Sequence, residues 1–344
     1  MSNLQEEQAA AVQPVDVADR ATGERREGQL ARRRHVIERL QGQGLILILA
    51  VVVGIMWSSS PYFMSTDNLL TAASVVSILG IMAVGETLII IAAEIDISIG
   101  SVMAVTSVLI GSLVAKGMNV WVAVAVAMLL AAGVGFVNGI LTVWFRINSL
   151  VVTLGMYSIV LGIAYVLSNS STVIIDQQGF SWLGSGKIGS VPVSVFIFLG
   201  VWLAGQAVLK LTALGRHIFA VGDNYDAAVR AGIRADGLRI GLFVAMSLSA
   251  GLAGVIVTSE LSSAAPQVGD PYLLAVVTAV ILGGASLAGG RGTLVGTLIA
   301  VAILGVLQNG FALLQFSVYT EYIVLGCLLI FAVLTDQLVR RSER

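Results

Sequence analysis

The chain has 344 residues, of which 57% are hydrophobic and only 11% are charged, and its formal net charge is −1. A soluble domain carries about 25% charged residues, so this composition excludes an ordinary soluble protein and indicates a membrane protein. A net charge this small provides no overall basic field, and we expect no nucleic-acid partner. The single cysteine, Cys327, excludes an internal disulfide, and we expect it to be a small buried hydrophobic residue.

The first forty residues differ from the rest of the chain because they are polar and contain no apolar core. We therefore expect no cleavable signal peptide and interpret residues 1–40 as a disordered tail with a basic end. Between Arg20 and Arg39, seven arginines accompany three acidic residues. An excess of arginine directly before a first membrane span places the N-terminus in the cytoplasm.

Ten apolar runs follow, each close to the roughly 20 residues that an α-helix needs to cross a bilayer. When successive connections alternate between the two sides of the membrane, nearly all Lys and Arg residues fall on the cytoplasmic side, and only Lys116 and Lys187 fall outside. The sequence therefore predicts an all-α polytopic membrane domain over 41–339, with ten transmembrane helices, cytoplasmic termini and a short tail at 340–344. The predicted spans are 44–59, 69–93, 97–115, 120–144, 150–167, 191–210, 238–259, 271–289, 293–313 and 319–335.

A weak internal repeat relates the two ends of this domain. The pattern Asp96-x-x-x-Gly100-Ser101 recurs as Gly292-x-x-x-Gly296-Thr297, 196 residues later. The same shift places the first four spans roughly on the last four. Duplicated halves are common in transporters, whose substrate sites lie at short or glycine-interrupted segments in corresponding positions.

Three acids interrupt the apolar stretch GETLIIIAAEIDISIGS at 85–101. Glu86 lies within a predicted span, where it would either line a pathway or form a purely structural hydrogen bond. Glu94 and Asp96 lie at a predicted break, which separates them from Glu86. Asp96 is well placed to cap a helix beginning at Ile97, with direct substrate contact as the alternative.

Several uncharged polar residues lie in similarly apolar surroundings. Interhelical hydrogen bonding is at least as good an explanation for them as contact with a polar solute. These further pathway or packing candidates are Ser98, Asn138, Gln308 and Asn309.

The connection 211–237 is the largest predicted cytoplasmic feature. It begins with Gly215-Arg216, is expected to turn at Gly222-Asp223-Asn224, and continues as YDAAVRAG at 225–232, where helix formers are closed by Gly232. We expect a short helix lying along the cytoplasmic face, with a solvated loop as the alternative.

A glycine-rich stretch covers the end of the predicted eighth span and the break after it, and it allows close backbone approach or a broken helix. Its members are Gly283, Gly284, Gly289, Gly290, Arg291 and Gly292. The two histidines, His35 and His217, have no partners at a metal-ligand spacing, so we expect no metal site. The chain also lacks a nucleophile elbow, a zinc-protease helix and a Walker lysine, which argues against an enzyme or a bound cofactor.

Three segments resemble, in order and spacing, signature segments of the membrane permeases of ribose-type ABC importers. They are the stretch at 85–101, GRHIFAVGDNYDAAVRAGI at 215–233 and AVILGGASLAGGRGTLVGTLIA at 279–300. The resemblance covers about residues 44–339. It implies a ten-helix permease of the bacterial inner membrane that pairs with a second, identical or closely related copy. It further implies docking to a cytoplasmic ATPase, which hydrolyses the ATP, and delivery of sugar by a periplasmic binding protein.

The resemblance also implies a role for the segment 211–237, which would lie against the ATPase. The matching residues are Gly215, Arg216, Gly222, Asn224, Ala227, Ala228, Gly232 and Ile233, and Asp226 lies among them. Two residues depart from the family pattern. Asp223 stands where the family often has glycine and adds charge to the docking surface. Glu94 stands where glycine usually precedes the Ile-Asp pair, which argues against a simple transfer of substrate type from ribose transporters.

The leading hypothesis is an importer subunit for a sugar or sugar-like polyol, with alternating access driven by the separate ATPase. The alternative is a proton-coupled secondary sugar transporter that uses Glu86, Glu94 or Asp96. The aromatic residues Trp144, Tyr157 and Trp202 are expected to be interfacial anchors or packing residues rather than a sugar platform.

Overall fold

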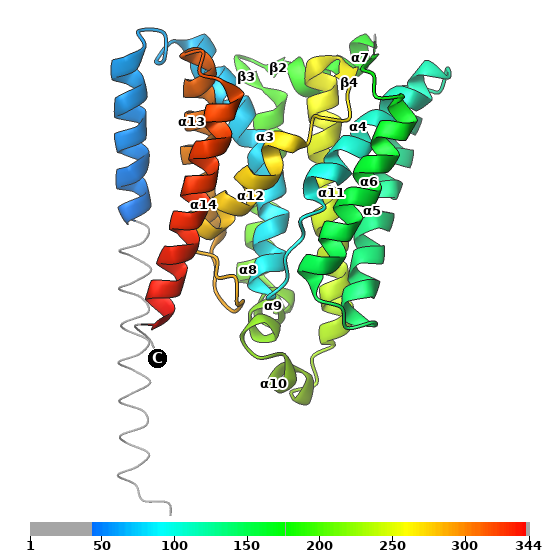
Figure 1. Ribbon diagram of the computed structural model, residues 1–344, viewed down its shortest axis with the longest axis vertical. Helices are drawn as coiled ribbons and strands as arrows, with labels where there is room; N and C mark the ends of the chain where they lie inside the picture. Colours follow the sequence, from blue (N-terminus) through cyan, green and yellow to red (C-terminus); the bar gives the residue numbers. More distant parts are fainter. Residues whose placement is uncertain (1–42, 176, 342–344) are drawn as a thin grey trace, which may run out of the picture. The chain divides into compact units, whose positions relative to one another are not determined.

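The structure is a computed structural model that describes residues 43–175 and 177–341 (Figure 1). The predicted tail at 1–40 and residues 342–344 of the predicted tail at 340–344 lie outside the described residues. The described residues from Leu47 onward form one compact unit, which contains every candidate site residue.

The described chain is built almost entirely of α-helices, which confirms the predicted all-α polytopic class. Seven helices are long and apolar enough to cross a membrane, and three shorter apolar helices coincide with the remaining predicted spans. The three shorter helices are Gln43–Ser59, α4 (Ile99–Ala115) and α12 (Asp270–Leu282). The seven long helices are α3 (Thr66–Ile91), α5 (Val120–Val143), α6 (Ser149–Ser168), α8 (Val193–Leu211), α11 (Ala235–Leu261), α13 (Leu294–Leu313) and α14 (Val318–Arg341).

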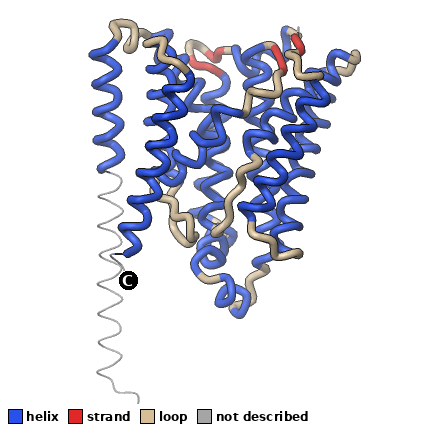
Figure 2. The backbone as a smooth tube through the Cα atoms, viewed as in Figure 1, coloured by secondary structure: helices blue, strands red, loops and turns tan. Residues whose placement is uncertain are grey.

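The connections at the two ends of the unit differ in character (Figure 2). One end carries α7 (Gln178–Ser185) and two small antiparallel sheets. Strand β1 (Val173–Ile174) pairs with β4 (Ser263–Ala264), and β2 (Lys187–Ile188) pairs with β3 (Val191–Pro192). The opposite end carries two short helices, α9 (Ala213–Asp223) and α10 (Tyr225–Arg230).

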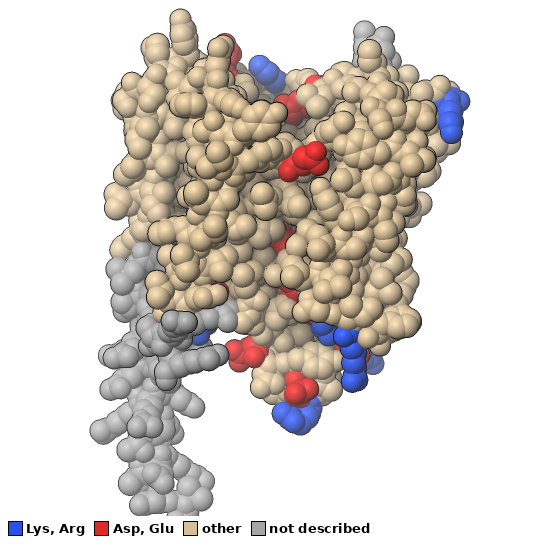
Figure 3. Space-filling view, in the orientation of Figure 1, with Lys and Arg blue, Asp and Glu red and all other residues tan. Residues whose placement is uncertain are grey.

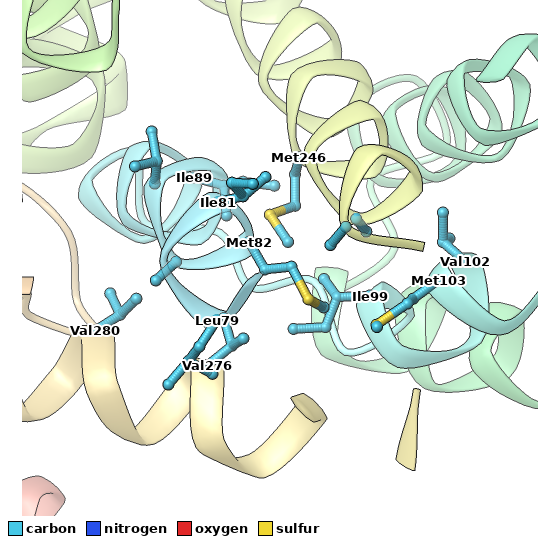
Figure 4. Packing of buried hydrophobic residues seen from close by; sticks show 14 of the residues in the cluster. Leu79, Ile81, Met82, Ile89, Ile99, Val102, Met103, Met246, Val276 and Val280 are labelled. Atoms are coloured by element: carbon cyan, nitrogen blue, oxygen red, sulfur yellow. The ribbon is translucent and has the colours of Figure 1, made fainter. Parts of the chain in front are cut away.

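Helix α3 is the centre of the core. Within its most apolar 18-residue window, 83% of the residues are buried, compared with 11% for α14. It packs against α8, α11, α12 and α13, because its apolar residues lie on all sides of the helix and every residue from Ser77 to Ile91 is buried. Figure 4 shows Met82 of α3 between Met246 of α11 and Ile99 of α4, and Leu79 of α3 beside Val276 of α12.

Helix α14 lies at the periphery, and this position corrects one sequence-based expectation. Cys327 is exposed on α14 rather than buried. An apolar helix in a membrane protein can present small apolar residues to lipid or to another subunit, so apolar surroundings in the sequence do not predict burial within the chain.

Several predicted helix boundaries are wrong. The last helix, α14, continues to Arg341, beyond the predicted end of its span at 335 and into the predicted tail at 340–344. Two other errors lie at the helix breaks. The span predicted at 271–289 ends at Leu282, and a nonhelical glycine loop, residues 283–293, follows it. Four glycines of this loop have positive φ angles, which glycine adopts at no steric cost and which end a right-handed helix. The helix expected from Ile97 begins at Ile99, with Ser98 as its N-cap.

The order of the helices agrees with the internal repeat. Adding 196 to the bounds of α4 (99 and 115) gives 295 and 311, which nearly coincide with Leu294–Leu313 of α13. The same addition to the bounds of α5 (120 and 143) gives 316 and 339, against Val318–Arg341 of α14. Both α4 and α13 run from the end that carries α9 toward the opposite end (Figure 1).

Candidate functional site

Positive charge is concentrated at one end of the unit. On the face shown in Figure 3, most Lys and Arg side chains gather at the end that carries α9 and α10. Three segments far apart in the sequence meet at this end, and they are the same three that carry the family-like motifs. They are the α3–α4 break (residues 92–98), the segment 211–237 and the glycine loop.

The segment 211–237 forms two helices rather than one. The predicted short helix is α10, with Asn224 as its N-cap accepting a hydrogen bond from the backbone N–H of Ala227 at 2.9 Å. The preceding helix α9 was not predicted. The turn predicted at Gly222-Asp223-Asn224 is confined to Asn224, because Gly222 and Asp223 belong to α9. Gly232, with φ +85°, ends the segment as expected of a helix-terminating glycine.

Residues of this segment separate into a buried and an exposed set. Gly215, Gly222 and Ala228 are buried, and Ala228 packs with Val221 and Ala235 in a small apolar cluster. The exposed residues therefore form the outer face of the segment. They are Arg216, Asp223, Asn224, Asp226, Ala227, Val229, Arg230 and Gly232.

The end of α9 makes a close backbone junction with both other segments. A side chain at Gly222 would overlap the carbonyl oxygen of Ile91, the last residue of α3, and would also meet the backbone nitrogen of Gly290. Gly290 itself donates its N–H to the Ile91 carbonyl at 2.8 Å. Gly289 lies equally close to the Gly222 carbonyl and to Ala93. This three-way contact, the glycine junction, allows no side chain at Gly222, so α9 cannot shift without moving α3 or the glycine loop.

A charged cluster forms a second connection between the same elements. Arg239 of α11 pairs with Glu94 of the α3–α4 break, and its Nε donates at 2.7 Å. The Arg239 guanidinium also lies over the ring of Tyr225 in α10, 5.4 Å from its centroid. The Tyr225 hydroxyl donates to Asp236 at 2.6 Å, and this hydrogen bond raises the pKa of Tyr225 above its ordinary value. Arg239 therefore ties α10 and α11 to the break.

A polar pocket of about 540 Å³ opens beside this cluster. It is lined by Glu94, Arg239, Tyr225 and Asp226 and by the connection between α5 and α6, which includes Arg146. The pocket leaves space between α10 and the α5–α6 connection, so α10 is not packed on all sides.

The two remaining acids lie together, contrary to the prediction that the break separates them. The chain turns back after α3, and the backbone N–H of Asp96 lies 3.4 Å from Oε1 of Glu86. Both residues are fully buried. Asp96 Oδ1 accepts from the backbone N–H of Ser98 at 2.8 Å and from its hydroxyl at 2.5 Å. Asp96 thus stabilises the turn just before α4, although Ser98 occupies the N-cap position.

Asn138 of α5 completes this buried polar cluster. Its side-chain nitrogen donates to the Ser98 hydroxyl at 3.0 Å and lies 3.5 Å from Oδ2 of Asp96. Glu86 Oε2 and Asn138 Oδ1 are buried without a hydrogen-bond partner. Burial of polar atoms is costly in a membrane, so Glu86 depends on its contact with the backbone N–H of Asp96.

The other candidates lie away from this end. Asn309 of α13 exchanges two amide hydrogen bonds with Asn68 of α3, each 3.0 Å long. Gln308 is partly buried one residue earlier and hydrogen-bonds Glu321 of α14. Within the glycine loop, Gly283 packs against Gly296 of α13, and Gly284, Arg291 and Gly292 complete the loop. Among the described residues, no three His, Cys, Asp or Glu side chains lie together as metal ligands.

Sequence reasoning missed Arg239 and Tyr225. Arg239 was counted only as a cytoplasmic charge, and Tyr225 only as part of a short helix. An available signal was the unusual Glu94, because an acid at a membrane break needs a cationic partner. The sequence contains several arginines in the predicted cytoplasmic connections, so it does not identify which one is the cationic partner of Glu94.

Comparison with known proteins places these features in context. Residues 68–333 match the family model described as "Branched-chain amino acid transport system / permease component". The chain is 39% identical over 301 residues to the ribose import permease protein RbsC of Escherichia coli (strain K12), covering 86% of this chain and 94% of that protein.

Two further relatives have other sugar names. The chain is 32% identical over 309 residues to the L-arabinose ABC transporter permease protein AraH of Azospirillum brasilense, covering 90% of this chain and 91% of the relative. It is 31% identical over 300 residues to the D-allose transport system permease protein AlsC of Escherichia coli (strain K12), covering 87% of this chain and 92% of that protein. No solved structure matches the chain.

Proposed function

Because the chain belongs to this family of transport permeases, we propose that it is the transmembrane subunit of a binding-protein-dependent ABC importer for a sugar or sugar-like polyol. The family description names branched-chain amino acids, whereas the curated relatives are named for ribose, arabinose and allose. The relatives match over nearly their whole length, so their shared substrate class is the better guide. Which sugar is carried depends also on the binding protein.

The proposed topology has ten membrane spans with both termini in the cytoplasm of a bacterial inner membrane. The three short helices would be spans that cross together with the nonhelical segments next to them. The concentration of Lys and Arg at the end that carries α9 and α10 supports a cytoplasmic position for that end. The opposite end, with α7 and the two small sheets, would then face the periplasmic binding protein.

The segment 211–237 is proposed to dock to a cytoplasmic ATPase, which binds and hydrolyses the ATP, while this chain binds no cofactor. A second copy of the permease, identical or closely related, would complete the membrane part. The observation that carries the proposal is the glycine junction. A displacement of α9 and α10 by the ATPase would act directly on the end of α3 and on the glycine loop, and hence on both helix breaks.

The charged cluster would transmit the same displacement along a second route. Motion of α10 would move Tyr225. Arg239, which lies over the Tyr225 ring, would follow, and so would its ion-pair partner Glu94. Because Glu94 lies two residues before Asp96, movement there reaches the turn that starts α4. Packed contacts of this kind have discrete arrangements, which suits a switch between outward and inward access.

Reconstitution tests the proposal directly. Proteoliposomes containing this chain, its ATPase and the sugar-loaded binding protein are expected to take up sugar only when ATP is available to the ATPase. Uptake by the chain alone, driven by a proton gradient without any ATPase, would contradict the proposal and support a proton-coupled transporter. Genes for an ATPase and a secreted binding protein beside this one would be an inexpensive supporting observation.

The docking surface can be tested separately with exposed residues. Substituting Ala227 and Val229 by Glu is expected to abolish co-purification of the ATPase while the permease still inserts. Ala228 is unsuitable for this test because it is buried, and a bulky side chain there would disrupt the segment itself. Gly241→Ala in α11 is the control, because it lies outside the segment 211–237 and an added Cβ there meets no atom within 4 Å. Normal ATPase binding by the double variant would contradict docking at this face.

A further inference from the structure

A groove runs between α6 on one side and α12 and α14 on the other. An apolar pocket of about 240 Å³ occupies one part of it. Leu150 of α6, Val277 of α12 and Leu329 of α14 contribute to its walls, and Ile95 and Ile97 of the α3–α4 break also line it. The pocket lining consists only of Ile, Leu and Val, so it offers no hydrogen bonds to a polar solute.

Polar residues lie on the same helix faces two turns away. Tyr157 is seven residues from Leu150, Asp270 is seven residues from Val277, and Tyr322 is seven residues from Leu329. Residues seven apart share one face of an α-helix and are separated along its axis by about 11 Å. The groove therefore has a second level beyond the apolar pocket, with a polar lining.

The directions of the three helices place these polar residues at one level. Helix α6 runs toward the end that carries the two sheets, whereas α12 and α14 run away from it (Figure 1). Tyr157 follows Leu150, but Asp270 and Tyr322 precede Val277 and Leu329. On all three helices, the step from the pocket residue to the polar residue therefore leads toward the end that carries the two sheets. Consistently, Asp270 interacts electrostatically with both Tyr157 and Tyr322.

Asp270 is exposed, and the two tyrosines are partly accessible. Figure 3 shows acidic side chains in the hollowed middle of the face. A charged carboxylate exposed at this depth is costly against lipid, so it faces water or polar groups. Carboxylate oxygens accept hydrogen bonds from hydroxyl groups, and phenols combine an apolar face with a hydroxyl that donates or accepts.

On the basis of the proposed function, we propose that Tyr157, Asp270 and Tyr322 form a polar band that contacts the hydroxyl groups of the solute on the outer half of its pathway. The apolar pocket beyond the band is a barrier, because a polyol would lose its hydrogen bonds there. Ile95 and Ile97 of this barrier flank Asp96, in the break that the ATPase-docking segment contacts. Movement of the break therefore opens the barrier to a solute already held at the band.

The test uses the complete importer in proteoliposomes, with ATPase and binding protein, and a panel of labelled pentoses, hexoses and polyols. Tyr157→Phe, Asp270→Asn and Tyr322→Phe are compared with Tyr319→Phe, a control on α14 whose ring is 78% exposed. Loss of one hydrogen bond to the solute is expected to lower the maximal uptake rate about 5- to 10-fold. The order of preference among the solutes should also change, whereas binding-protein affinity, ATPase co-purification and permease pairing stay unchanged.

A labelling experiment gives an independent readout. Asp270→Cys is introduced in a Cys327→Ser background, and its reaction with a membrane-impermeant maleimide is followed in the assembled importer. Solute-loaded binding protein is expected to slow the labelling, and the Tyr319→Cys control should react at the same rate with or without solute.

The outcomes separate the two proposals. Absence of ATP-dependent uptake in the wild type would overturn the proposed function and this inference with it. Wild-type uptake accompanied by unchanged rates and preferences in all three band variants would overturn the inference alone. Loss of permease pairing in the band variants would also overturn it, because the band would then be a contact with the second copy.

Discussion

The two helix breaks lie at corresponding positions of the internal repeat but are built in opposite ways. The α3–α4 break contains Glu94 and Asp96, whose carboxylates are held by Arg239 and by Ser98. The glycine loop between α12 and α13 ends its helix by removing side chains, and Gly289 and Gly290 adopt positive φ angles. One break is held by side-chain hydrogen bonds and the other by backbone contacts.

Both breaks meet α9, and this shared contact shows what the difference achieves. At the glycine junction, backbone meets backbone, which fixes distances with almost no freedom. At the charged cluster, long side chains connect the elements and can follow a moving partner. We infer that the first connection sets the geometry of the coupling and that the second keeps the break attached as α10 moves.

The most severe test of this comparison is Gly222→Ala. Its added Cβ would overlap the carbonyl oxygen of Ile91, and backbone cannot move aside as a side chain can. We expect a destabilisation of about 3 kcal/mol and loss of ATP-driven uptake. Thermal unfolding of the purified permease and uptake in proteoliposomes measure the two effects. Gly241→Ala, outside the segment 211–237, should behave like the wild type in both assays, and equal stability of the two variants would show that the junction is not tight.

The contribution of the charged cluster to the α3–α4 break is tested by Arg239→Gln. This change leaves the buried Glu94 carboxylate without its cation, which we expect to cost about 2–3 kcal/mol of stability. Glu94→Gln in the same chain should restore most of this loss, because the buried charge is then removed as well. Unfolding of the two single variants and the double variant completes a double-mutant cycle. Additive effects would show that the pair contributes nothing to holding the break.

A smaller effect is expected at Asp96. Asp96→Ala leaves the N–H and hydroxyl of Ser98 buried without their acceptor, at a cost of about 2 kcal/mol. Asp96→Asn retains one acceptor oxygen and should cost less than half as much. The difference appears in the unfolding midpoint of the purified permease. Equal midpoints for the two variants would indicate that the negative charge, rather than hydrogen bonding, holds the turn.

Much of the fold was predictable because long apolar runs with short polar breaks determine where membrane helices begin and end. The predicted helix ends are wrong where tertiary contacts decide at which residue a helix stops. The sequence gives no sign that Gly222 continues α9 rather than turning the chain. The residue that Gly222 contacts, Ile91, lies 131 positions earlier in the sequence. Likewise, the approach of Asp96 to Glu86 depends on the chain reversing after α3. Tyr157 could not be recognised as a groove residue before α6, α12 and α14 were placed together.

The smallest effect is expected from Glu86→Gln, and it decides between the two transport mechanisms. Glu86 Oε1 faces the backbone N–H of Asp96, and a glutamine oxygen can take the same place. If ATP drives transport, no proton needs to move through this carboxyl, and uptake should stay within about twofold of the wild type, less than the loss of one hydrogen bond. Initial uptake rates at saturating ATP provide the measurement, with Asp96→Asn as a comparison in the same cluster. Loss of uptake in a Glu86→Gln importer that still assembles with its ATPase would mean that this buried acid must titrate. Coupling to protons would then replace coupling to ATP as the better explanation of transport.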